Sequence, residues 1–181
     1  MAVIPKPEKK TAEEYLQMPE TNQHREFWDG EIVNFAAPSV LHQDIAGGVY
    51  AEIRQFIRTS HGGCKPMIAP FDVRIDDTHV VQPDVLVVCD PSKLDGKLCQ
   101  GVPDWVVEVT SSNRADDFDR KLRLYKKSGV REYWIVDTDE RMVWVYVFEQ
   151  HPNVVEMYNW TDEIPVGIYG GALRIRIQDL V

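Results

Sequence analysis

The sequence lacks any long apolar run. No stretch approaches the roughly 20 apolar residues that a membrane-spanning helix needs, and the first ten residues, MAVIPKPEKK, lack the apolar core of a signal peptide. Internal repeats and low-complexity tracts are also missing. With 181 residues, 44% hydrophobic and 27% charged, the composition predicts one globular domain over residues 1–181, with residues 1–10 flexible and no membrane partner.

Cysteine is scarce. The chain has only Cys64, Cys89 and Cys99, and no two of them form a C-x-x-C pair. An odd number of widely spaced cysteines is typical of a reducing compartment rather than of a disulfide framework. We therefore expect free thiols, no zinc site built from them, and a cytoplasmic location.

Positive charge is also in short supply. The formal net charge is -9, which excludes a protein that coats nucleic acid by charge alone. Residues 114–131 reverse this balance, with seven basic residues against three acidic ones. Such a run is usually a solvated helix face, and charge alone favours that interpretation. The alternative is a phosphate-facing, nucleic-acid-binding patch, whose members would be Arg114, Arg120, Arg123, Lys126 and Lys127.

Three helices are predicted. TAEEYLQ reads as a short helix, and Pro38-Ser39 opens a long one that continues to about Ser60. Its apolar residues recur on one face, at Ile45, Val49, Ile53, Phe56 and Ile57. Gly47 and Gly48 in that helix suggest close packing against a sheet. The third helix runs from Asp117 to Lys127, with Phe118, Leu122 and Tyr125 directed inward.

Strands account for most of the remaining chain. EFWDGEIVNFA predicts a hairpin around Asp29-Gly30, and DPSKLDGKLCQG predicts a loop. The other predicted strands are MIAPFDVRI, VVQPDVLVV, PDWVVEVTS, EYWIVD, MVWVYVF, VVEMYNW and ALRIRI. This order indicates an α/β (α+β) fold in which helices pack on a mixed sheet.

Glu108 lies inside PDWVVEV, a run typical of a buried strand. Burying a carboxylate costs several kcal/mol unless a partner compensates it. If the PDVLVV strand is its neighbour, Asp84 comes to the same side of the sheet. Two adjacent carboxylates repel unless a cation lies between them, and Mg2+ suits such a pair, with the Val109 carbonyl as a further oxygen ligand. Alone, Asp84 is more simply a turn or cap residue, and an arginine could pair with Glu108.

Lys121 is the third candidate. Asp117, Lys121 and Tyr125 recur at a spacing of four and share one helix face. Asp117 and Lys121 could form an exposed ion pair of small energy. Alternatively, the ammonium faces the metal and neutralises charge on a phosphate.

These motifs together resemble a known family. REFWDGEIV, HQDIAGGV, QPDVLVV, PDWVVEVTSS and SGVREYWIVD, in this order from about Thr11 onward, are similar to the Uma-two group of restriction-endonuclease-like proteins in the PD-(D/E)XK nuclease superfamily. The resemblance implies a restriction-endonuclease-like sheet core flanked by helices, with additional C-terminal strands. It also implies Mg2+-dependent hydrolysis of phosphodiester bonds in DNA, with Mn2+ as a substitute ion.

The resemblance assigns roles to individual residues. Asp84 and Glu108 match the metal ligands. The superfamily places lysine two residues after this glutamate, where Thr110 stands, and in this group the lysine comes from the following helix, here Lys121. Auxiliary positions match Glu31, His42, Asp117 and Tyr125. The family commonly has Ser-Pro-Ser after the glutamate strand, whereas this chain has Ser111-Ser112-Asn113 and is one residue shorter before Asp117, which is expected to shift the helix start.

The remaining candidates are weaker. His24, His61, His79 and His151 lack ligand spacing. Four strand aromatics are expected in the core or an interface, with base stacking as the alternative; they are Tyr133, Trp134, Trp144 and Tyr146. The leading hypothesis is a metal-dependent DNA endonuclease, cutting as a homodimer by analogy with enzymes that cleave both strands. The alternatives are a catalytically inactive module that binds nucleic acid or protein, and a structural protein in which an arginine pairs with Glu108.

Overall fold

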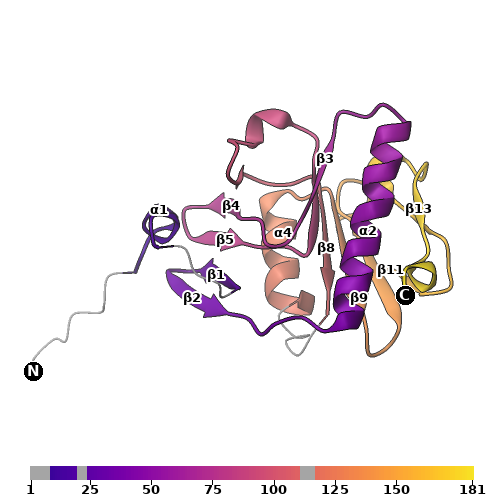
Figure 1. Cartoon of the computed structure of the whole chain (residues 1–181), viewed down its shortest axis with the longest axis horizontal. Coiled ribbons are helices and arrows are strands. Elements are labelled where there is room, and N and C mark those ends of the chain that lie inside the picture. The colour runs from indigo at the N-terminus through magenta and orange to yellow at the C-terminus, as the bar shows by residue number, and fades with distance from the viewer. Residues whose placement is uncertain (1–8, 20–23, 111–116) are drawn as a thin grey trace, which may run out of the picture.

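The computed structural model describes residues 9–19, 24–110 and 117–181 (Figure 1). The predictions made for residues 1–8, for Ser111-Ser112-Asn113 and for Arg114 lie outside these ranges. The helices are α1 (Ala12–Leu16), α2 (Val40–Thr59) and α4 (Leu122–Ser128), with a π-helical turn η2 (Asp117–Lys121) and the short 3-10 helices η1 (Pro91–Lys93), η3 (Gly167–Tyr169) and η4 (Ile177–Leu180). The strands are β1 (Arg25–Trp28), β2 (Glu31–Asn34), β3 (Lys65–Ile68), β4 (Val73–Asp76), β5 (His79–Val81), β6 (Val85–Val88), β7 (Cys99–Gln100), β8 (Trp105–Val109), β9 (Glu132–Asp137), β10 (Met142–Val147), β11 (Glu156–Asn159), β12 (Ile164–Pro165) and β13 (Arg174–Ile175).

The predicted helices are confirmed, and local hydrogen bonds explain where two of them start. Thr11 and Glu14 form a reciprocal capping box on α1. The Ser39 side chain accepts the His42 N–H at the start of α2. The apolar face predicted for α2 is buried, except that Phe56 is only half-buried.

The glycine pair in α2 corrects a prediction about packing. A Cβ added to Gly48 would lie 2.8 Å from Leu180 Cβ, whereas one added to Gly47 would meet no described heavy atom within 4 Å. The close approach at Gly48 is therefore made against η4 and not against a sheet.

The strands form two large sheets within the described residues, where one mixed sheet was predicted. One sheet has the order β11-β10-β9-β8-β6-β3 and the other β2-β1-β5-β4-β7, with β12 and β13 as a separate pair. In the first sheet β8 and β9 are parallel and the other pairs antiparallel. MIAPFDVRI is divided at Pro70 into β3 and β4, and VVQPDVLVV at Pro83 into β5 and β6, because proline has no N–H to continue a ladder.

Three smaller expectations are also wrong in extent. The segment DPSKLDGKLCQG, predicted as a loop, contains η1 and β7. In ALRIRI only Arg174 and Ile175 pair as a strand, and the chain then enters η4. In VVEMYNW the strand begins at Glu156, after the exposed Val154 and Val155.

The six-stranded sheet is covered on both faces. One face packs against α2 and the C-terminal segment, which lie together on the right of Figure 1. The other face packs against α4 and the five-stranded sheet. Because side chains alternate along a strand, Trp105, Val107 and Val109 of β8 face α2, while Val106 and Glu108 face α4. The lone carboxylate of β8 is thus aimed at the helix that carries Lys121.

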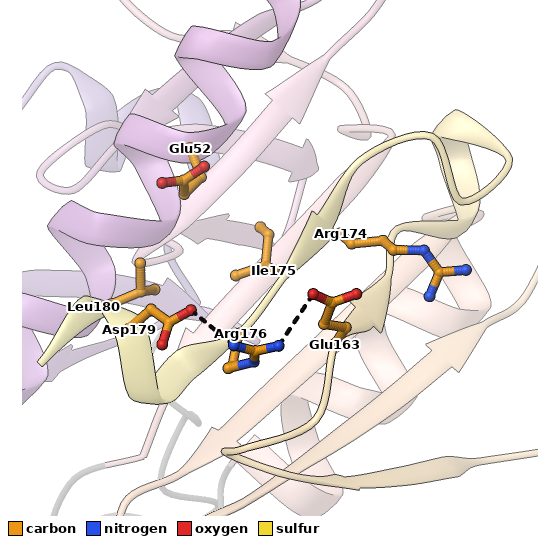
Figure 2. Close-up of a pocket in the computed structure, with 7 residues that line it drawn as sticks. All are labelled: Glu52, Glu163, Arg174, Ile175, Arg176, Asp179 and Leu180. Carbon is orange, nitrogen blue, oxygen red and sulfur yellow. Dashed lines mark hydrogen bonds and ion pairs between the residues drawn. The ribbon is translucent and has the colours of Figure 1, made fainter.

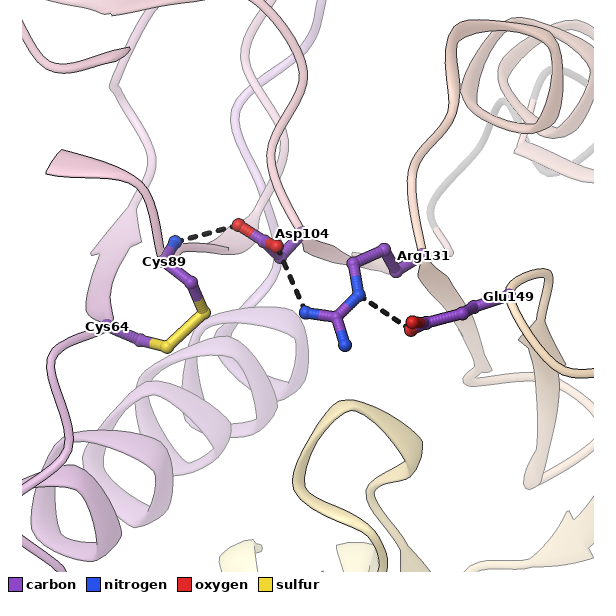
Figure 3. Close-up of a disulfide and its surroundings, with 5 residues drawn as sticks. All are labelled: Cys64, Cys89, Asp104, Arg131 and Glu149. Carbon is purple, nitrogen blue, oxygen red and sulfur yellow. Dashed lines mark hydrogen bonds and ion pairs between the residues drawn. A yellow bond between two sulfur atoms is a disulfide. The ribbon is translucent and has the colours of Figure 1, made fainter. Parts of the chain in front are cut away.

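The expectation of free thiols is wrong for two of the three cysteines. Cys64 and Cys89 form a disulfide with an S–S distance of 2.07 Å (Figure 3). They directly flank the pair Lys65 and Val88 in the β3–β6 ladder, so the antiparallel register brings them opposite each other. Cys99 is free and buried. A separation of 25 residues gave no sign of this adjacency in the sequence.

The disulfide has a charged neighbour. The Cys89 N–H donates to Asp104 Oδ2 at 2.7 Å, and Arg131 bridges Asp104 and Glu149 at 3.2 and 2.6 Å (Figure 3).

None of the described helices is long and apolar enough to cross a membrane.

Candidate active site

Asp84 and Glu108 meet because β6 and β8 are neighbours. In this antiparallel pair Val85 lies opposite Val107, so the register carries Asp84 to the level of Glu108. The neighbouring strands that the sequence analysis required are therefore present. The two acids lie at the end of the six-stranded sheet where α2 begins.

Asp84 is held in one orientation from two sides. Its Oδ2 accepts the Val109 N–H at 2.8 Å and lies 3.1 Å from His42 Nε2. The Ala69 N–H donates to the Asp84 carbonyl at 3.0 Å. Both of these side-chain contacts use Oδ2. His42, expected near the site, is buried beside Asp84.

Glu108 is 2% exposed and has two partners on the helix above it. Its Oε2 lies 3.0 Å from Lys121 Nζ, and its Oε1 accepts the Tyr125 hydroxyl proton at 2.8 Å. The predicted shared face of Lys121 and Tyr125 is confirmed. The partners of Glu108 that the structure describes on this helix are thus a lysine and a tyrosine, which compensate part of the cost of burying its charge.

Tyr125 acts as a donor in this arrangement. Burial, followed by the negative charges of Glu108 and Glu26, raises the pKa of Tyr125 well above its usual value. Its hydroxyl therefore stays protonated at neutral pH, so Glu108 Oε1 is the acceptor.

Lys121 is the last residue of a π-helical turn. This turn, η2, begins at Asp117 and continues directly into α4, and such turns often occur at functional sites. Phe118 points inward as predicted, with its ring 5.2 Å from that of Trp144. Asp117 is the first described residue of this range, so the predicted helix start is not tested, and the Asp117 side chain lies outside the described part of the chain.

The contacts described for Glu31 and for the basic residues Arg120, Arg123 and Lys126 are made with residues outside the site. Glu31 is exposed on β2, opposite Trp28 in the β1–β2 ladder. Arg123 pairs with Asp119 on its own helix. Lys126 donates to Asn153 at 2.9 Å, and the Arg120 guanidinium lies 4.2 Å from the Trp28 ring centroid. These contacts agree with a solvated helix face, and the phosphate-facing patch stays a prediction.

Sequence reasoning missed a further buried carboxylate. Glu26 is 1% exposed; its Oε2 accepts the Trp28 indole N–H at 2.7 Å and its Oε1 accepts the Gln82 N–H at 2.8 Å. Glu132 has a similar arrangement with Trp134, also at 2.7 Å. A glutamate two residues before a tryptophan on a strand was the available signal.

The carboxylate pair suits a hard divalent cation, although protein ligands alone would not complete its shell. No group of three or more His, Cys, Asp or Glu side chains suited to a metal ion occurs among the described residues. Mg2+ is commonly bound by one or two carboxylates and several waters. Asp84 Oδ1, which takes part in neither contact of that side chain, and the Glu108 carboxylate are the oxygens that fit this role.

A polar pocket lies away from this site. It has a volume of about 140 Å³ and is lined by α2 and the C-terminal segment (Figure 2). Arg176 bridges Glu163 and Asp179 there, at 3.1 and 3.4 Å. Glu52 in its wall follows His42 by ten residues of α2, a rise of about 15 Å.

Comparison with known structures defines the class of fold first. A crystal structure described as a putative nuclease belonging to DUF820 from Anabaena variabilis ATCC 29413 matches with a TM-score of 0.77 and 22% identity, covering 94% of this chain and 96% of that chain. The fold is therefore the restriction-endonuclease-like one expected from the sequence. The chain belongs to the Uma2 family, described as "Putative restriction endonuclease", whose model matches residues 12–167. Among curated proteins, none matches the chain.

Proposed function

We propose that this chain is a metal-dependent endonuclease that hydrolyses phosphodiester bonds in DNA. The observation that carries the proposal is the convergence of two buried carboxylates and a buried ammonium, Asp84, Glu108 and Lys121, at one end of the sheet. Membership of the Uma2 family supports it.

In this proposal each residue has a defined task. Asp84 and Glu108 would hold Mg2+, or Mn2+ in its place, with the Val109 carbonyl as a candidate further ligand. When bound, the ion supplies an activated water and stabilises negative charge on the phosphate. Lys121 places a compact positive charge beside Glu108, where it can bind a phosphate oxygen. Tyr125 orients Glu108, while His42 and the Val109 N–H orient Asp84.

The charge distribution limits how strongly this protein holds DNA. The chain carries a net charge of -9, and Arg123 and Arg131 are paired with acids. Because phosphate contacts supply most of the non-specific affinity for DNA, we infer weak binding outside the site itself.

A catalytically inactive module that binds nucleic acid or protein is the second candidate. The specific observation that favours it is the engagement of both Glu108 oxygens by Lys121 and Tyr125, since these two partners already compensate this carboxylate.

Three further proposals accompany the leading one: a single domain over residues 1–181, a homodimer and a cytoplasmic location. The cysteine argument for that location no longer holds for Cys64 and Cys89.

The proposal is tested by incubating the purified protein with supercoiled and with single-stranded DNA, in Mg2+, Mn2+ or chelator. Glu108→Gln removes the central carboxylate charge. Glu132→Gln is the matched control, because it makes the same change at a buried glutamate at the other end of the sheet.

We expect cleavage that needs the metal ion, persists in Glu132→Gln and disappears in Glu108→Gln. Metal-dependent cleavage by Glu108→Gln at the wild-type rate contradicts the assignment of Glu108. If the wild-type protein cleaves neither substrate with either ion, the inactive binding module becomes the better description.

A further inference from the structure

Glu26 is a buried side chain for which the proposed mechanism has no use. Its two oxygens accept N–H groups from Trp28 and from the main chain of Gln82. Both partners are donors, so both oxygens have to act as acceptors. Each oxygen holds an N–H group in place, so the contribution of Glu26 has to be sought in what these two groups position.

One partner leads directly to Asp84. Gln82 follows β5 of the five-stranded sheet, and Asp84 precedes β6 of the six-stranded sheet, so Gln82-Pro83-Asp84 is the whole connection between β5 and β6. Pro83 fixes one backbone dihedral of this connection. Gln82 Nε2 also donates to Asp72 at 2.7 Å. The Glu26 hydrogen bond therefore fixes the approach of the chain to the acidic pair.

The other partner leads to the helix of Lys121. The indole held by Glu26 contacts the Arg120 guanidinium, at 4.2 Å from the ring centroid, and Arg120 immediately precedes Lys121. The charge of Glu26 also contributes to the raised pKa of Tyr125, which places Glu26 within electrostatic range of the site. One carboxylate thus connects both arms of the candidate site.

We propose that Glu26 is a positioning residue of this site, fixing Asp84 through the Gln82 main chain and the Lys121 helix through Trp28. The effect on turnover rests on the proposed nuclease function, whereas the positioning of Asp84 does not. The two parts therefore need separate measurements.

Glu26→Gln is the informative variant. An amide has one oxygen and one NH2 group, so in either orientation its NH2 group opposes one of the two donors, the Trp28 indole N–H or the Gln82 N–H, and the contact with Gln82 is lost or weakened. Adding Trp28→Phe removes the indole donor and should restore the contact with Gln82. Glu132→Gln is again the matched control, because Glu132 accepts from Trp134 and from the Gly167 and Ile168 N–H groups at the opposite end of β9.

The first measurement is amide hydrogen exchange by NMR in the full chain without metal. The Val109 N–H reports on Asp84, to which it donates, and the Gln82 N–H reports on Glu26. We expect both amides to exchange at least about tenfold faster in Glu26→Gln, as for loss of a hydrogen bond to a charged group. We expect little change in Glu132→Gln and recovery in Glu26→Gln/Trp28→Phe.

The second measurement is cleavage, with a larger fall in kcat than change in KM expected for Glu26→Gln alone. The proposal is overturned if exchange of the Val109 N–H accelerates equally in Glu26→Gln and Glu132→Gln. It is also overturned if exchange in Glu26→Gln/Trp28→Phe stays as fast as in Glu26→Gln. If the wild-type protein proves inactive, the nuclease assignment fails while the amide exchange still decides whether Glu26 positions Asp84.

Discussion

The three buried glutamates among the described residues are compensated in two different ways. Glu26 and Glu132 are surrounded by neutral N–H donors from tryptophan and the main chain. Glu108 instead contacts an ammonium and a hydroxyl. Neutral donors fix a carboxylate in place without neutralising it, whereas the ammonium beside Glu108 occupies a position that suits a cation. This difference separates Glu26 and Glu132 from Glu108, one of the two candidate metal ligands.

Glu132 offers a test of the cost of burial at the residue scale. Burial raises the pKa of Glu132 although hydrogen bonds from Gly167, Ile168 and Trp134 oppose it. A raised pKa means that the folded state favours the protonated acid. Its contribution to stability is complete below the ordinary value of 4.5 and is lost as the pH rises through the raised pKa.

We therefore expect the unfolding free energy of wild type minus that of Glu132→Gln to be larger at pH 4 than at pH 7.5. It should shrink by about 1.4 kcal/mol for each unit by which the pKa is raised. Urea denaturation of both proteins at the two pH values measures this. A difference that grows with pH contradicts the assignment.

At the scale of elements, α2 contains an internal comparison between adjacent glycines. Alanine at position 47 meets no described neighbour and should stabilise the protein by up to about 1 kcal/mol, because alanine has the higher helix propensity. Alanine at position 48 gains the same propensity but collides with Leu180. Overpacking of this kind costs about 1–3 kcal/mol, so Gly48→Ala should be destabilising overall.

Thermal or chemical unfolding of Gly47→Ala and Gly48→Ala provides the measurement. Because the clash involves Leu180 Cβ, rotating the leucine side chain cannot relieve it, and η4 has to move. Equal stabilisation by both substitutions would show that η4 yields freely.

Elements with a strong local signal were predictable. α2 has both a serine cap and a regular apolar face, and β8 is continuously apolar apart from Glu108. The same isolation made Glu108 and, through its partner strand, Asp84 recognisable. Lys121 followed from its spacing to Tyr125 and from the family resemblance.

Features that depend on contacts between distant segments were not predictable. Glu26 looks like a solvent-facing residue of a short hairpin, and its burial arises only because the two sheets come together around Gln82. The division of two predicted strands at Pro70 and Pro83 likewise places their halves in different sheets. Local patterns give the strands, but the sheet to which each belongs is a tertiary outcome.

At the scale of the whole molecule, the disulfide closes one outer edge of the six-stranded sheet. Among the described strands β3 is the last of that sheet and pairs only with β6, and the Cys64–Cys89 bridge links the two (Figure 3). Closing a loop of 25 residues restricts the unfolded chain by about 3 kcal/mol in the chain-entropy model.

Reduction should therefore lower the unfolding free energy by about 3 kcal/mol, measured by denaturant titration with and without reductant. The Cys64→Ser/Cys89→Ser double variant, which has no bridge, is the control, and its unfolding free energy should not change with reductant. An unchanged wild-type curve in reductant would contradict a stabilising role.

The burial of Cys99 has a consequence for thiol chemistry in the folded chain. Burial raises the pKa of Cys99 to about 11, so almost none of it is thiolate at neutral pH, and only the thiolate attacks a disulfide. Cys99 is therefore not expected to react with the Cys64–Cys89 disulfide. Neither shuffling of the bridge nor covalent coupling of two chains through Cys99 should occur while the protein stays folded. An odd number of cysteines thus still permits a single pairing.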